Sequence, residues 1–314
     1  MGSELLSMFA LVKTHSGVRR LELARPNIGS DFDVILEPVR AGLCRTDLNV
    51  AWGRTHCEPP RVLGHEVSGV VSAIGARVTR ISVGDRVAIN PLLPCGVCAE
   101  CTSARPCPSP RMLGVDLDGG FAQALLVPEQ AAHLVPDSMS FERAAYVEPV
   151  AATLAVLDSP IARDARGLVL GVGRIAELTQ RVLFARGFRS VLTQPVTAAP
   201  EPRSFDWVID TVGSCASLET AMGSLRQRGI LVLKSRPAAP VTFDVSLAVQ
   251  RELALYAVRY APFSDAIELL SAATFVVEDL FGQTHPLSAF EQVFDQAGAS
   301  EISKVFFAPN AESC

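Results

Sequence analysis

The stretch from Gly167 to Ala176, GLVLGVGRIA, most constrains what this chain can fold into. Its first four residues read as a short buried strand, Gly171 and Gly173 allow a tight turn, and residues 174–186 read as a helix. A strand that runs through such a turn into a helix lets a pyrophosphate approach the helix N-terminus. The sequence therefore predicts a dinucleotide-binding domain with a doubly wound parallel sheet.

The second strand of this predicted sheet, residues 190–193, lacks the acid that usually holds the adenosine ribose. It ends in Thr193-Gln194-Pro195, so NAD and NADP both remain open as cofactors. A Pro- and Ala-rich segment, residues 195–202, then leads straight to the next apolar strand, residues 205–213. Because no helix and further strand fit between them, we expect an abridged sheet.

Cofactor contacts are expected at the glycine turn and at the ends of the following strands. Ala176 stands where a third glycine is common, and Arg174 adds a positive charge for phosphate. The predicted cofactor-binding residues are Gly171, Gly173, Arg174, Ile175, Thr193, Val212 and Lys234.

Composition excludes several other classes of protein. The 314 residues are 49% hydrophobic and 19% charged, which is typical of a globular chain of two domains. A net charge of -5 argues against nucleic acid or an anionic membrane as the main partner. The sequence contains neither a long apolar run nor a basic segment followed by an apolar one, so we expect a cytoplasmic protein.

A second constraint lies between Gly42 and Glu66, where Cys44 precedes His65 and Glu66 by about twenty residues. A soft thiolate, a borderline imidazole and a hard carboxylate form the mixed ligand set that a catalytic zinc accepts. By themselves a cysteine and a histidine at this spacing are more often a buried thiol and a hydrogen-bonded ring. The pair becomes informative through the residues that follow it.

A third feature is the spacing C-x2-C-x2-C-x5-C in a proline-rich stretch, formed by Cys95, Cys98, Cys101 and Cys107. Four thiolates this close together suit a tetrahedral structural zinc. Disulfides are the alternative, but they do not fit a chain without a secretory signal, and the short spacings favour one metal ion over two bridges. We predict a structural zinc here.

Several short motifs together resemble the zinc-containing alcohol dehydrogenase signature of the medium-chain dehydrogenase/reductase superfamily, in its polyol and threonine dehydrogenase branch. They are Gly42-Leu-Cys-Arg-Thr-Asp47, Gly64-His-Glu66, Gly69, Val71, Gly75, Val78 and Gly84-Asp-Arg-Val87. The resemblance implies a GroES-like β-rich catalytic domain over residues 1–150, with the zinc lobe at about 91–110. It further implies a Rossmann cofactor domain over 151–280 and a return to the catalytic domain over 281–314.

In this family a Glu-Pro pair supplies the third zinc ligand, and Glu148-Pro149 matches that pair. The resemblance therefore implies Cys44, His65 and Glu148 as ligands of a catalytic zinc, with Glu66 as the alternative ligand or an outer partner. The family's hydroxyl for the proton relay matches Thr46. Many relatives carry a histidine three residues later, where this chain has Asn49, which cannot act as a base.

The implied reaction is NAD(P)-dependent oxidation of a secondary alcohol, or the reverse ketone reduction. The expected substrate is a polyol, an amino alcohol or a cyclitol-like alcohol, and relatives are usually homodimers or homotetramers. Two other readings stay open. The same zinc could catalyse a non-redox elimination or hydration, or the abridged chain could be a degenerate dehydrogenase that acts as a binding or scaffold subunit.

Overall fold

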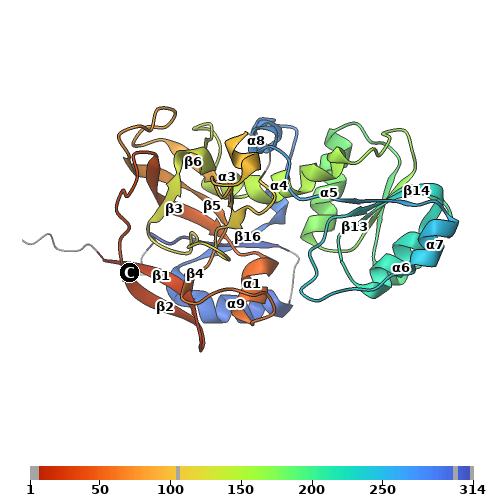
Figure 1. Ribbon diagram of the computed structural model, residues 1–314, viewed down its shortest axis with the longest axis horizontal. Coiled ribbons are helices and arrows are strands. Elements are labelled where there is room, and N and C mark those ends of the chain that lie inside the picture. Colours follow the sequence, from red (N-terminus) through yellow and green to blue (C-terminus); the bar gives the residue numbers. More distant parts are fainter. Residues whose placement is uncertain (1–6, 104–106, 300–302, 312–314) are drawn as a thin grey trace, which may run out of the picture. The chain divides into compact units, whose positions relative to one another are not determined.

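The computed structural model describes residues 7–103, 107–299 and 303–311 (Figure 1). The chain divides into two compact units, one formed by residues 1–148 and 278–314 and the other by residues 149–277. The second unit is thus an insertion between two pieces of the first. Within the described ranges, no helix is long and apolar enough to cross a membrane.

The first unit is rich in β-strands. Its larger sheet has the order β10-β6-β5-β3-β17-β16, and β9 also pairs with β3. A three-stranded sheet, β2-β1-β4, and a small β7-β8 ladder complete it. The strands are β1 Ser7–Thr14, β2 Gly17–Ala24, β3 Asp33–Gly42, β4 Arg61–Val62, β5 Glu66–Ile74, β6 Arg86–Ile89, β7 Leu92–Leu93, β8 Arg111–Met112, β9 Leu125–Pro128, β10 Ala132–Leu134, β16 Phe281–His285 and β17 Lys304–Phe307.

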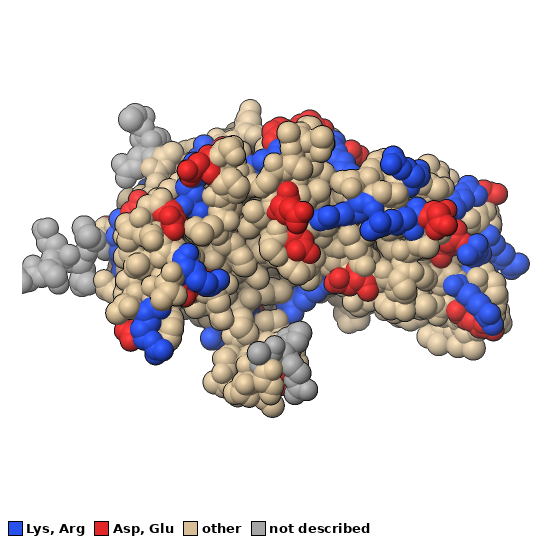
Figure 2. Space-filling model, turned by 90° about the horizontal axis from the view of Figure 1, so that it is seen from above, with Lys and Arg blue, Asp and Glu red and all other residues tan. Residues whose placement is uncertain are grey.

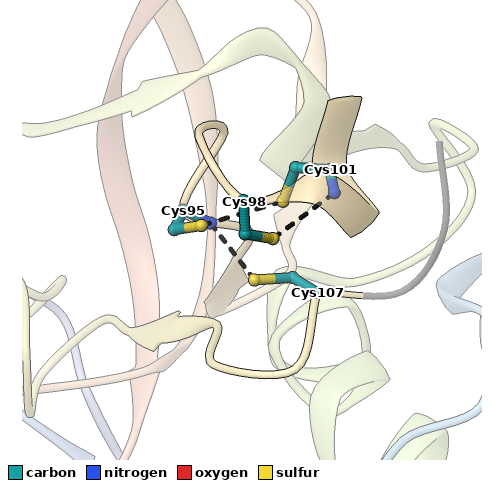
Figure 3. Close-up of side chains that lie close together, drawn as sticks. All are labelled: Cys95, Cys98, Cys101 and Cys107. Carbon is teal, nitrogen blue, oxygen red and sulfur yellow. Dashed lines mark hydrogen bonds between the residues drawn. The ribbon is translucent and has the colours of Figure 1, made fainter. Parts of the chain in front are cut away.

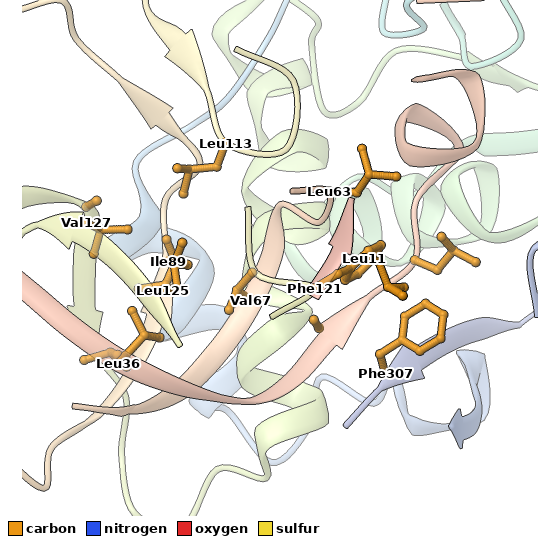
Figure 4. Packing of buried hydrophobic residues seen from close by; sticks show 14 of the residues in the cluster. Leu11, Leu36, Leu63, Val67, Ile89, Leu113, Phe121, Leu125, Val127 and Phe307 are labelled. Atoms are coloured by element: carbon orange, nitrogen blue, oxygen red, sulfur yellow. The ribbon is translucent and has the colours of Figure 1, made fainter. Parts of the chain in front are cut away.

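Short helices connect these strands. They are α1 Arg45–Ala51, α2 Ala99–Thr102, α3 Phe141–Ala145 and α9 Phe290–Ala299, while α4 Val147–Leu154 crosses into the second unit. Alternate residues of β3, β5 and β6 point into one apolar core, in which Leu36, Val67 and Ile89 lie close together (Figure 4). This core gives the strand ends near Gly42 and Glu66 a rigid support.

The second unit is a five-stranded sheet of parallel strands in the order β12-β11-β13-β14-β15. The strands are β11 Gly167–Leu170, β12 Val191–Gln194, β13 Phe205–Asp210, β14 Leu225–Leu233 and β15 Ala254–Ala257. Between β12 and β13 there is only a 3-10 turn, Val196–Ala198. The predicted abridged Rossmann sheet is therefore confirmed. Because no further strand follows β12 before β13, β12 forms one edge of the sheet.

Helices pack on both faces of this sheet. Successive residues of β11 point to opposite faces, and all four are buried, so both faces must be covered. Val169 contacts the apolar side of α5 Arg174–Ala185, and Leu168 faces the cluster that contains α6 Cys215–Ser224. The remaining helices are α7 Val245–Gln250 and α8 Phe263–Ser271. The arrangement is doubly wound, with the glycine turn and the loops after β12, β13 and β14 at the carboxyl edge of the sheet.

Both signs of charge occur on the face of the molecule shown in Figure 2. Groups of Lys and Arg side chains are interspersed there with Asp and Glu side chains and with large uncharged areas. No single-sign field covers that face, which agrees with the overall charge of -5.

Candidate zinc and nucleotide sites

The β3–β5 ladder brings together the three residues of the first predicted metal site. Gly42 pairs with Glu66 at the end of β3, Cys44 begins α1, and His65 directly precedes β5. One donor atom each of Cys44, His65 and Glu66 lies within 4.8 Å of the other two. His65 and Glu66 are buried, and Cys44 is half-buried. The donor set therefore fits a zinc ion that keeps one side accessible.

Asp47 holds this group in place from the first turn of α1. Its carboxylate accepts the N–H of Cys44 at 2.9 Å and that of Gly64 at 3.1 Å, and it lies 3.2 Å from His65 Nδ1. With Nδ1 engaged, the other ring nitrogen of His65 is the one available to a metal ion. Burial acts most strongly and lowers the pKa of His65, but Asp47 and Cys44 together raise the pKa well above its usual value.

Glu66 has a second partner that the sequence did not reveal. Lys304, at the start of β17, forms an ion pair with Glu66 Oε2, and both side chains are almost fully buried. Lys304 Nζ also donates to the carbonyl oxygen of Leu43 at 2.9 Å. The residues come from distant parts of the sequence, and nothing in the local pattern around Lys304 distinguishes it from a surface lysine.

Glu148 and the predicted relay residue Thr46 lie on α4 and α1. Glu148 is buried in the first turn of α4, but it is not among the three residues whose donor atoms lie within 4.8 Å of one another. Thr46 and Asn49 are half-buried on α1, one turn apart. The structure thus places Glu66 in a compact donor group with Cys44 and His65, and the choice of Glu148 as the third ligand stays a prediction.

The four cysteines of the second predicted site converge in the lobe around α2 (Figure 3). All four sulfurs lie within 4.8 Å of one another, and Cys95 Sγ is 3.9 Å from Cys101 Sγ. That separation is far longer than a disulfide bond, and the thiols are free. The shortened spacing before Cys107 does not prevent it from joining the group.

Hydrogen bonds within this lobe shift the pKa values of two of its thiols in opposite directions. A bond from the backbone N–H of Val97, followed by further donors, lowers the pKa of Cys95 to about 6. A hydrogen bond with Cys98 and then burial raise the pKa of Cys101 to about 12. Thiols that share protons in this way are close enough to be bridged by one cation.

The glycine turn of the second unit has the backbone that close approach of a phosphate requires. Gly171 and Gly173 both have positive φ angles, of 142° and 87°. A side chain at position 171 would overlap the hydroxyl of Thr211. Gly173 is the residue before α5, whose first residues Arg174 and Ile175 are accessible to solvent. The first N–H groups of α5 are available to a phosphate.

The corner between the turn and β12 contains polar atoms without partners. Gly171 N–H donates to the carbonyl oxygen of Gln194 at 2.8 Å, so the end of β12 lies beside the turn. Thr193 Oγ1 and Gln194 Oε1 are buried and, among the described residues, make no hydrogen bond. Buried polar atoms that lack partners are uncommon. Both residues end β12 at the carboxyl edge of the sheet, where a ribose is expected, and are themselves half-buried.

Val212 and Lys234 follow β13 and β14 at the same carboxyl edge. Val212 is exposed, and the Lys234 N–H donates to the carbonyl oxygen of Asp210 at 3.1 Å. Asp210, which the sequence did not single out, accepts hydrogen bonds from the backbone of Val212 and Gly213. Burial raises its pKa, and these bonds oppose that effect. Asp210 therefore fixes the loop after β13.

Comparisons with known proteins agree with this geometry. Residues 30–137 match the model of the alcohol dehydrogenase GroES-like domain. Sorbitol dehydrogenase of Bacillus subtilis is 26% identical over 91% of this chain and 92% of its own, and L-threonine 3-dehydrogenase of Thermococcus kodakarensis is 33% identical over 59% of this chain and 55% of its own. Acetophenone reductase of Geotrichum candidum, solved in complex with NAD, is 19% identical with a TM-score of 0.84 and 98% coverage of both chains.

The fold, the donor groups and these relatives define one class of protein. The chain is an oxidoreductase that carries an alcohol dehydrogenase GroES-like domain at residues 30–137 and is similar over most of its length to sorbitol dehydrogenase and D-xylulose reductases. The resemblance read from Gly42–Asp47 and Gly64–Glu66 is confirmed.

Proposed function

We propose that the protein is a zinc-dependent dehydrogenase that transfers a hydride between a secondary alcohol and NAD(P). The observation that carries the proposal is the compact group of Cys44, His65 and Glu66, held by Asp47. Bound there, zinc supplies a Lewis acid that lowers the pKa of an alcohol. Cys44 and His65 would hold the ion, with Glu66 or Glu148 as the third ligand. A small polyol or amino alcohol is the proposed substrate class, in keeping with the sorbitol and threonine relatives.

The chain's own residues have separate tasks in this proposal. Asp47 orients His65, and Thr46 passes the alcohol proton outward through its hydroxyl. Asn49 cannot take that proton, because an amide has no basic site near neutral pH. The proton therefore leaves Thr46 through water or the cofactor ribose. The four thiolates of the cysteine lobe would hold a second, structural zinc and leave no position for substrate.

The proposed cofactor site belongs to the second unit. The glycine turn and the first N–H groups of α5 would bind the pyrophosphate, and Thr193 and Gln194 would bond the adenosine ribose. Gln194 is neutral, so a 2'-phosphate meets no repulsion there and either NAD or NADP is accepted. Residues 1–150 and 281–314 form the catalytic domain and residues 151–280 the cofactor domain in this proposal.

A homodimer or homotetramer is the proposed assembly. Its support is the outer edge of β15, where Leu255 and Tyr256 are each 37% exposed, and the neighbouring Phe243 and Val249, which are exposed as well. Apolar side chains beside an open strand edge favour pairing with a second copy. A zinc-binding group of four cysteines needs reduced thiols, which favours a cytoplasmic location.

The cofactor proposal is tested by energy transfer from Trp207, which is buried in the sheet of the second unit, to NADH and to NADPH. Micromolar binding of both is expected for the zinc-loaded protein. In Gln194→Asp a carboxylate would favour the ribose hydroxyls and repel the 2'-phosphate, so NADPH binding should fall by about tenfold or more while NADH binding persists. Leu192→Asp, an exposed change on the same strand, is the control.

Two outcomes would favour the other readings. Zinc at the first site with turnover but no change in nicotinamide absorbance would indicate elimination or hydration chemistry. No binding of either nucleotide, together with no zinc at Cys44, would indicate a scaffold subunit. Ordinary dehydrogenase turnover requires both the metal and the nucleotide.

A further inference from the structure

The strongest unexplained feature beside the donor group is a buried lysine. Lys304 is 1% exposed and pairs with Glu66, which is 2% exposed. An ammonium group this deep is costly unless an opposite charge and further acceptors satisfy it. The carboxylate of Glu66 and the carbonyl oxygen of Leu43 supply both.

The backbone around the pair is arranged to admit it. β17 runs antiparallel to β3, with Phe306 opposite Gly42, and Leu43 N–H donates to the carbonyl oxygen of Val305 at 2.9 Å. A side chain at Gly42 would overlap both the Glu66 carboxylate and the Lys304 chain. The missing side chain at Gly42 leaves the space in which the two charges meet.

Glu66 therefore has two competing partners. Its carboxylate belongs to the donor group with Cys44 and His65, and the same carboxylate is paired with Lys304. A carboxylate oxygen engaged by an ammonium group donates less electron density to a metal ion, because part of its charge is already neutralised. A strong bond to one partner weakens the bond to the other.

We propose that Lys304 is a positioning residue that keeps Glu66 a weak and exchangeable metal ligand. The inference rests on the metal site of the proposed function. By holding the carboxylate, Lys304 keeps the bond between Glu66 and the metal ion weak, so that Glu66 can leave the ion when a substrate oxygen binds. Without the lysine, the same three donors would bind the metal ion more tightly and Glu66 would exchange slowly.

The test compares metal binding in variants of the full-length protein, with the cysteine lobe kept loaded with zinc. Removing the ammonium group in Lys304→Met frees the buried carboxylate for the metal ion. We expect the dissociation constant for Co²⁺ at the first site, measured by chelator competition, to fall about tenfold or more. The visible bands of the bound cobalt should shift as an oxygen ligand strengthens. Lys304→Arg keeps the charge and should restore wild-type affinity and bands.

A double-mutant cycle separates this role from a general effect on packing. In Glu66→Gln the carboxylate is absent, so adding Lys304→Met should change neither the cobalt affinity nor the bands. The double variant exchanges an ion pair for two neutral side chains of similar length, which buried sites commonly tolerate. If Lys304→Met does not fold, Lys304→Gln removes the charge and still can donate to Leu43, and the same tightening is expected.

Two results would overturn the inference. One is an unchanged cobalt affinity and spectrum in Lys304→Met or Lys304→Gln; the other is an equal effect with and without the Glu66 carboxylate. If instead the wild-type protein takes up no more cobalt than Cys44→Ser does, the first site binds no metal and the proposed function fails as well. Measuring cobalt uptake by the wild type first tells the two failures apart.

Discussion

The two metal-ligand groups of this protein are built in opposite ways. The cysteine lobe takes all four donors from thirteen consecutive positions, between Cys95 and Cys107, and its thiols are half-exposed. The group of Cys44, His65 and Glu66 is assembled by the pairing of β3 with β5 and lies in the core. Around it are further buried charges, Asp47 and Lys304, that belong to no ligand motif.

This contrast shows how two metal-ligand groups in one chain can suit two different purposes. Four local thiolates can close around a metal ion without help from the rest of the fold, which is sufficient for holding a loop. A site that binds and releases substrate needs its donors oriented and their strength adjusted by neighbours. We therefore expect substitutions in the first group to change chemistry and substitutions in the lobe to change stability.

The largest effect is expected from Cys44→Ser. A hydroxyl is a poor zinc ligand at neutral pH, so the metal should leave the first site and turnover should fall by roughly 10³-fold or more. Metal analysis should show one zinc per chain instead of two, with unchanged thermal unfolding. Cys57→Ser, a half-buried cysteine of the same unit outside both groups, is the control. Full activity in Cys44→Ser would refute the assignment.

Cys98→Ser in the lobe should produce the opposite pattern. Loss of one thiolate opens the structural site, and we expect the melting temperature to fall by roughly 10 °C, which corresponds to about 3 kcal/mol in a domain of this size. Activity per folded molecule should remain within a few-fold of the wild type. Cys215→Ser, at an exposed thiol of the second unit, should change neither quantity. A large loss of activity without loss of stability would contradict the comparison.

Asp47→Asn tests whether the carboxylate beside His65 strengthens metal binding at the first group. The amide retains some hydrogen bonds but no longer supplies a negative charge to His65. Zinc affinity at the first site should weaken by about 10- to 100-fold, as outer partners of metal-bound histidines commonly contribute. Competition with a chelator measures it. Asp116→Asn, which removes a charged turn residue whose carboxylate bonds the Met112 N–H, should leave affinity unchanged.

The smallest expected effect is a pH dependence of thiol reactivity in the zinc-free lobe. Because the pKa of Cys95 is lowered to about 6, its thiolate fraction and its rate of alkylation should rise roughly tenfold between pH 5 and pH 7. Cys101, with a pKa raised to about 12, should react last. Iodoacetamide labelling followed by peptide mass mapping gives both rates. Equal reactivity of the two thiols would show that the lobe rearranges without metal.

Much of the architecture could be predicted because it depends on short-range patterns. The glycine turn before α5 and the missing segment between Gln194 and Phe205 are visible as spacing alone, and the abridged sheet followed from them. The clustering of Cys95, Cys98, Cys101 and Cys107 is equally local. Each of these features is formed by residues that are close together in the sequence, so packing against distant segments changes it little.

The surroundings of the first donor group were harder to predict. Lys304 comes 238 positions after Glu66 and looks like any strand lysine, and only the pairing of β17 with β3 brings the two together. Asp47 was seen as part of a motif, but its bonds to Cys44, Gly64 and His65 need the α1 geometry. The preference for Glu148 over Glu66 rested on resemblance, and it stays a prediction for the metal-binding experiments.

The sequence by itself determined which residue types could bind metal and nucleotide, and where the chain turns from strand to helix. The reason is that ligand chemistry and glycine conformations are properties of single residues and their near neighbours. The tertiary structure alone brought Glu66 into one group with Cys44 and His65 and paired it with a buried ammonium. Those outcomes depend on strand register and on the exclusion of water, which arise only when distant segments pack into one core.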